Sequence, residues 1–117
     1  MKIAVDAMGG DFAPKEIVAG AILAAKRYDC EIVLVGDQTQ IQKELDKNYP
    51  EWRKSTISIH HASDVVGMGE HPGVAVRRKK DSSIVVATRL VKEGKCDAVL
   101  SAVSYTHLRA HETSLHL

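Results

Sequence analysis

The stretch IAVDAMGGD, residues 3–11, begins as a continuous apolar run and breaks at a pair of glycines. A short apolar run that ends at a turn signal is typical of a buried strand. In an open α/β sheet, the loops after the carboxyl ends of the strands form the crevice where ligands bind. We therefore predict the first strand here, with Gly9 and Gly10 in a loop at the ligand-binding edge.

Two carboxylates flank this glycine pair, Asp6 before it and Asp11 after it. Glycines let a ligand approach the main chain, and a carboxylate beside a tight loop can orient a nucleophile, hold a cation or cap the next helix. A plain strand-to-helix turn capped by Asp11 explains the same spacing equally well. Asp6, Gly9, Gly10 and Asp11 are the candidate catalytic residues.

Apolar periodicity predicts strands that alternate with helices along the chain. A chain of 117 residues is long enough for one domain, and the alternation favours an open, mainly parallel, Rossmann-like sheet with helices on both faces, a three-layer α/β/α fold. The predicted elements are a helix from Pro14 to about Arg27 with a stripe of Ile17, Val18, Ala21, Ile22, Ala25 and Tyr28, a strand at 32–35, a helix carrying Ile41 and Leu45, a strand at 56–60 at or near a sheet edge, a helix at 84–93 and a strand at 98–100.

Helix-capping signals mark two of these helices. Thr39, with Gln42 three residues later, forms a capping-box pattern for the second helix. Asp81 or Ser82 is the expected N-cap of the helix at 84–93, and Gly94 lies just past its end.

The run RRKKDSS, residues 77–83, precedes that last helix. Cations, hydroxyls and the free N–H groups of a helix N-terminus together form an anion site suited to phosphate. A solvated charge run with an ordinary N-cap is the competing interpretation. Lys79, Lys80, Ser82 and Ser83 are therefore the candidate phosphate-binding residues.

Several other classes of site lack support in the sequence. There is no Walker motif and no complete G-x-G-x-x-G fingerprint, although Asp37 follows a strand as a ribose-binding acid would. The histidines at 60, 61 and 71 lack a third well-spaced ligand, so we expect no metal site. The 16 basic and 15 acidic residues argue against a nucleic-acid binder, and Cys30 and Cys96 are expected to be reduced, buried residues of a cytoplasmic protein with no membrane span or signal peptide.

With VDAMGGD at 5–11 and RRKKDSS at 77–83, the chain resembles the bacterial phosphate acyltransferases of phospholipid synthesis. The resemblance covers residues 1–102 and implies transfer of a long acyl chain from acyl carrier protein to inorganic phosphate, without a cofactor. It also implies that Lys79, Lys80, Ser82 and Ser83 bind phosphate while Asp6, Gly9, Gly10 and Asp11 shape the reaction centre. Family members are expected to be homodimers about three times this length, loosely associated with the membrane surface or with the glycerol-phosphate acyltransferase.

The chain departs from the family pattern after Ala102. Residues 103–117 hold three of the six histidines and show no strand period, so we expect an unrelated tail there and an incomplete catalytic cleft, with one face of the sheet exposed. A Rossmann-like nucleotide- or phosphate-binding module and a fragment with no function of its own remain the alternatives.

Overall fold

The apolar run at the start of the chain forms β1 (Lys2–Asp6), an inner strand of a four-stranded parallel sheet in the order β3-β2-β1-β4. The computed structural model describes residues 1–9, 12–63 and 82–101. The other described elements are α1 (Lys15–Arg27), β2 (Glu31–Gly36), α2 (Gln38–Asn48), the 3-10 turn η1 (Trp52–Lys54), β3 (Ile57–His61), α4 (Ser83–Lys92) and β4 (Ala98–Leu100).

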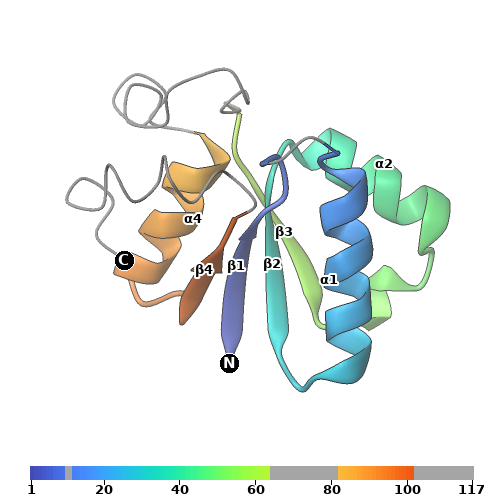
Figure 1. Ribbon diagram of the computed structural model, residues 1–117, viewed down its shortest axis with the longest axis horizontal. Coiled ribbons are helices and arrows are strands. Elements are labelled where there is room, and N and C mark those ends of the chain that lie inside the picture. Colours follow the sequence, from blue (N-terminus) through green and yellow to red (C-terminus); the bar gives the residue numbers. More distant parts are fainter. Residues whose placement is uncertain (10–11, 64–81, 102–117) are drawn as a thin grey trace.

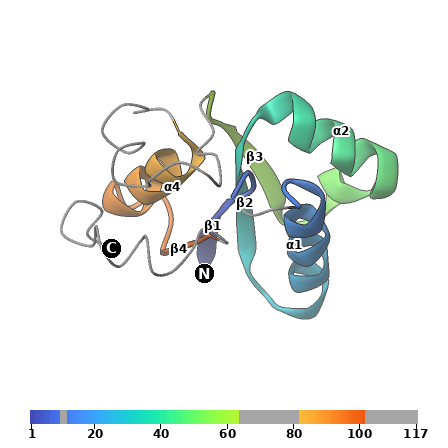
Figure 2. The same cartoon turned by 45° about the horizontal axis from the view of Figure 1, so that its top comes forward.

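The order of the strands fixes which face each helix covers. The chain first steps outward from β1 to β2 and β3, then returns to place β4 on the other side of β1. Because crossovers between parallel strands are right-handed, this reversal puts α1 and α2 on one face and α4 on the other. Figures 1 and 2 show these two layers on opposite sides of the sheet. The predicted Rossmann-like α/β architecture is confirmed, in the incomplete form expected.

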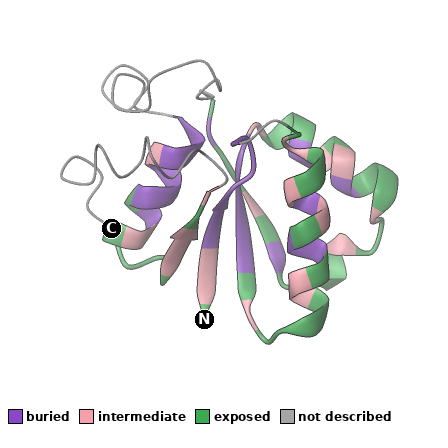
Figure 3. Cartoon of the chain, in the orientation of Figure 1, coloured by how far each residue is buried: buried purple, intermediate pink, exposed green. Residues whose placement is uncertain are grey.

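Strand alternation divides the core into two apolar clusters. Val5 and Leu34 pack with α1 and α2, whereas Ala4 and Val35 pack with Val86 of α4. The middle of the sheet is therefore buried on both sides, as Figure 3 shows, which explains why β2 is continuously apolar instead of alternating. β3 lies at the edge of the described sheet, as predicted, and its exposed positions carry polar side chains.

Two local predictions were wrong and one was confirmed. The N-cap of α2 is Asp37, whose carboxylate accepts a hydrogen bond from the Gln40 N–H at 3.2 Å, so Thr39 lies inside the helix and caps nothing. Tyr28 is the C-cap of α1, with extended backbone angles, and is 65% exposed, so it does not belong to the buried stripe of the helix. The predicted cap of α4 is confirmed at Ser82.

The two cysteines differ in burial. Cys96 is buried in the cluster beneath α4, and burial raises the pKa of its thiol. Cys30 is only partly buried. Both thiols are free, as expected.

Candidate active-site edge

The carboxylate of Asp6 is the central polar group at the carboxyl edge of the sheet. Asp6 ends β1 and is only 1% exposed. Its Oδ1 accepts hydrogen bonds from the Met8 N–H at 3.1 Å and from the Ser83 hydroxyl at 2.5 Å, and its Oδ2 accepts one from the Ser101 hydroxyl at 3.0 Å. One carboxylate thus joins three segments that are far apart in the chain.

The backbone after β1 is held in place by its neighbour β2. The Ala7 N–H donates to the Val35 carbonyl at 2.9 Å, so pairing continues one residue past the strand. The Met8 side chain then packs against Gly36, where an added Cβ would overlap its Cγ. The absence of a side chain at Gly36 therefore makes room for the Met8 side chain.

Two serines begin α4 next to this carboxylate. The Ser82 hydroxyl accepts from the Val85 N–H at 3.4 Å, as an N-cap does, and Ser83 is the first helical residue. Both serines are buried. Since a helix N-terminus carries partial positive charge, its position beside an acidic side chain is electrostatically favourable.

These groups lie where the sheet changes direction. α1, which follows β1, and α4, which leads into β4, cover opposite faces of the sheet, so the gap between the carboxyl ends of β1 and β4 is the topological switch point. Asp6 is the last residue of β1 and Ser101 directly follows β4, while Ser83 reaches Asp6 from the face covered by α4. This is the position where open α/β sheets bind ligands.

The structure tests the placement of only part of the predicted site. Gly9 is buried at the end of the first described segment. Gly10, Asp11, Lys79 and Lys80 lie outside the described residues, as does most of the predicted loop between 62 and 73. Of the predicted residues, Asp6, Ser82 and Ser83 come together. Ser101 was missed, although its position directly after an apolar strand matches that of Asp6 and could have identified it.

The polar residues at the end of β2 and β3 have structural partners. Asp37, the residue that resembled a ribose-binding acid, caps α2. The His61 Nδ1 accepts a hydrogen bond from the Gln38 N–H at 3.1 Å. Across residues 1–9, 12–63 and 82–101, no three His, Cys, Asp or Glu side chains are grouped so that they could hold a metal ion. His71 lies outside these ranges.

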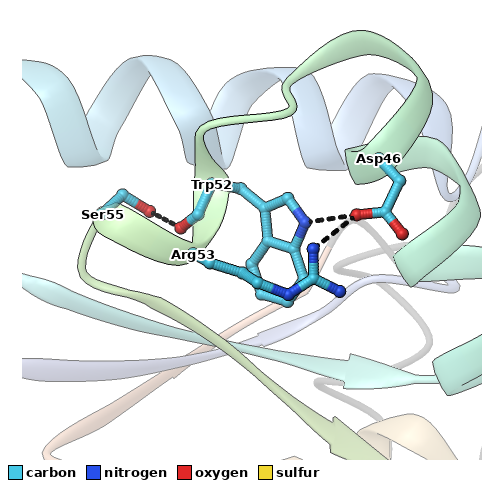
Figure 4. Close-up of polar contacts among 4 residues, drawn as sticks. All are labelled: Asp46, Trp52, Arg53 and Ser55. Carbon is cyan, nitrogen blue, oxygen red and sulfur yellow. Dashed lines mark hydrogen bonds and ion pairs between the residues drawn. The ribbon is translucent and has the colours of Figure 1, made fainter.

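A second polar cluster lies near the opposite end of the sheet, where η1 leads into β3. Asp46 accepts hydrogen bonds from the Trp52 indole N–H at 2.8 Å and from Arg53 at 3.0 Å, as Figure 4 shows. These hydrogen bonds hold the pKa of Asp46 below its usual value, and the bond from Trp52 has the largest effect. The Arg53 guanidinium also lies 4.6 Å from the centre of the Trp52 ring. The cluster fastens η1 to the end of α2.

Comparison with known proteins places this edge in a family context. Residues 1–111 match the family described as "Fatty acid synthesis protein". Proteins named "Phosphate acyltransferase" from Desulforamulus reducens, Moorella thermoacetica and Pelotomaculum thermopropionicum are 61%, 56% and 55% identical over 104 residues. Each alignment covers 89% of this chain and 30% of the relative.

The chain therefore spans about 30% of the length of these relatives. None of the helices in the described part of the chain combines the length and the apolar character needed to cross a membrane.

Proposed function

The chain belongs to the fatty acid synthesis protein family, and from that premise we propose that it forms part of an acyltransferase that moves a long acyl chain from acyl carrier protein to inorganic phosphate. The names of the relatives support the reaction class. Because the chain spans about 30% of their length, the activity is proposed for the longer protein. The acyl phosphate formed would feed phospholipid synthesis.

The observation that carries this proposal is the Asp6 carboxylate at the switch point, joined to Ser83 and Ser101. A buried, hydrogen-bonded carboxylate fixes the end of β1 and the start of α4 relative to each other. Reactions of bound substrates depend strongly on such positioning. We infer that these bonds hold the sheet edge in place where the glycine loop and the cationic run of residues 77–80 would meet a ligand.

The chemistry needs little from the protein beyond positioning and charge. A phosphate oxygen attacks the thioester carbonyl, a C–O bond forms, the C–S bond breaks, and the carrier leaves as a thiol after taking up a proton. Cations and N–H groups must hold the phosphate, and further donors must stabilise the oxyanion that develops on the carbonyl. No covalent enzyme intermediate is required.

We assign the cationic run and the start of α4 to the phosphate. Lys79 and Lys80 supply charge, and Ser82 and Ser83 supply donors at the helix N-terminus, where anions bind well. In the described structure the Ser83 hydroxyl donates its hydrogen bond to Asp6. Ser83 would therefore bind phosphate with its backbone N–H, while its hydroxyl holds Asp6 in position. Asp6, Gly9, Gly10 and Asp11 shape the reaction centre.

The remaining assignments follow from the resemblance. We propose a cytoplasmic homodimer that associates peripherally with the membrane or with the glycerol-phosphate acyltransferase, and that uses no cofactor and binds no nucleic acid. We place the boundary of the family domain at residue 102, although the family match runs to residue 111. Sequencing an independent clone of the source locus across codons 101–117 tests that boundary.

The activity is tested in a chimera in which residues 1–101 replace the matched part of the Desulforamulus reducens relative. We expect the chimera to form acyl phosphate from a long-chain acyl carrier protein and inorganic phosphate, detected by mass spectrometry. Lys80→Ala should raise the KM for phosphate by about tenfold or more, because a charge-assisted contact contributes roughly 1.5–3 kcal/mol. Lys54→Ala, at an exposed residue of η1, is the matched control.

Three results would count against the proposal. An unchanged phosphate dependence in a folded Lys80→Ala chimera would remove the phosphate assignment. A folded chimera that transfers no acyl group but binds a nucleotide would favour the nucleotide-binding alternative, and one that does neither would favour a fragment with no function of its own.

A further inference from the structure

An apolar groove lies on the face of the sheet that α1 covers, between α1 and the strands β1 and β4. It has a volume of about 590 Å³ and extends from Ser101 at the carboxyl edge of the sheet to Met1 and Cys30 at the amino edge. Ile3 and Val5 of β1 form part of its floor together with Leu100 of β4. The groove therefore follows the full length of the strands.

The groove leaves large apolar side chains in water. Leu100 is 62% exposed, and Tyr28 and Met1, at the far end, are 65% and 75% exposed. Within the described residues β4 pairs only with β1, so it forms an edge of the sheet on this side. A contiguous apolar surface beside an open strand edge is typical of an interaction site.

Gly20 gives an independent sign that something packs in the groove. It lies in the interior of α1, where glycine is about 1 kcal/mol less favourable than alanine. A Cβ added at Gly20 would meet nothing within 4 Å, so no contact in the described structure requires a glycine. Gly20 lines the groove together with Ile17 and Ala24, which share its face of the helix.

We propose that this groove seats an apolar helix from the part of the family's chain that lies beyond the matched residues. The relatives carry about 70% of their length outside the match, which provides the segment. A helix at this position would complete the layer beside α1, and the small Gly20 and Ala24 would let the two helix axes approach to about 8–10 Å. The inference concerns assembly of the fold and does not depend on acyl transfer.

The length and shape of the groove favour a helix over other occupants. A groove that runs beside one helix along the strands of a sheet has the shape that a second helix of the same layer would fill. If a second copy of this chain filled it, none of the additional residues of the relatives would pack on this face. Residues 102–117 lie outside the described residues. They and a second copy are distinguished by the test below.

The test compares Gly20→Leu in two settings, the 117-residue chain and the chimera with the Desulforamulus reducens relative. In the chain alone, the substitution should leave the melting temperature unchanged or raise it, since the added side chain enters open space on a helix. In the chimera it should lower the melting temperature by several degrees, because the new side chain would occupy the place of the docked helix. Lys26→Leu, at an exposed position of α1 outside the groove, should lower the melting temperature of neither the chain nor the chimera.

Each other result overturns the proposal. A chimera that tolerates Gly20→Leu as well as Lys26→Leu has no helix in the groove. Destabilisation of the isolated chain would mean that residues 102–117 or a second copy fill it, and only the second copy would make the melting temperature depend on protein concentration. Leu100→Glu provides an independent check, because it should lower the melting temperature of the chimera far more than that of the chain. All of these readouts are thermal, so a chimera without activity still gives a result.

Discussion

Replacing Asp6 by alanine should destabilise the chain strongly, because the carboxylate serves three donors at once. Two of these donors, the Met8 N–H and the Ser83 hydroxyl, belong to buried residues. An orphaned buried donor costs roughly 1–3 kcal/mol, so the two together cost about 2–6 kcal/mol. Ser101 is only half-buried and can turn to water. Removing a buried charge without such bonds would instead be neutral or stabilising.

The measurement is urea unfolding of the 117-residue chain followed by circular dichroism. With a slope of about 2 kcal/mol/M, the middle of the usual range, a loss of about 2–6 kcal/mol in Asp6→Ala should lower the urea midpoint by roughly 1–3 M. Asp6→Asn keeps an acceptor oxygen and the shape of the side chain but loses the charge, so about 1–2 kcal/mol should be lost. If the alanine variant is unfolded in water, the asparagine variant still gives a value.

Asp37→Ala is the matched control, since it removes the same side chain from an exposed helix cap and should cost about 0.5–2 kcal/mol. We expect Asp6→Ala to cause the largest loss in the free energy of unfolding, and Asp6→Asn and Asp37→Ala to cause smaller losses. An Asp6→Ala chain as stable as wild type, or no less stable than Asp37→Ala, would refute the idea that Asp6 ties the sheet edge together.

Two further predictions concern the packing around the sheet. Gly36→Ala should destabilise the chain by about 1–3 kcal/mol, because the added methyl would overlap Met8 and crowd its neighbours, and an unchanged urea midpoint would contradict this. Iodoacetamide in the native state should modify Cys30 well before Cys96, because Cys96 is buried and its pKa is raised while Cys30 is partly accessible, and raising the pH should speed the reaction of Cys96 by forming its thiolate. Equal rates for the two thiols, measured by mass spectrometry of peptides, would show that the core beneath α4 opens freely.

Local features of the sequence were enough to predict the elements. The runs at β1 and β2 are continuously apolar because both of their faces are covered, and that pattern is visible without a structure. Ser82 and Gly94 mark the ends of α4 because a cap and a left-handed residue depend only on the local backbone, with φ at Gly94 of +76°. The cap of α2 was misplaced because Thr39 and Asp37 both satisfy a capping pattern, and only the backbone angles choose between them.

The sequence by itself determined that the chain alternates strands and helices, and that Asp6 ends a buried strand. Only the tertiary structure decided which groups Asp6 would meet. Ser83 and Ser101 lie 77 and 95 residues away along the chain. They reach Asp6 because β4 pairs with β1 instead of with β3, and that choice depends on long-range packing. The open space beside Gly20 was also decided by the tertiary structure, because the neighbours of a helical position depend on how the strands pack against the helix.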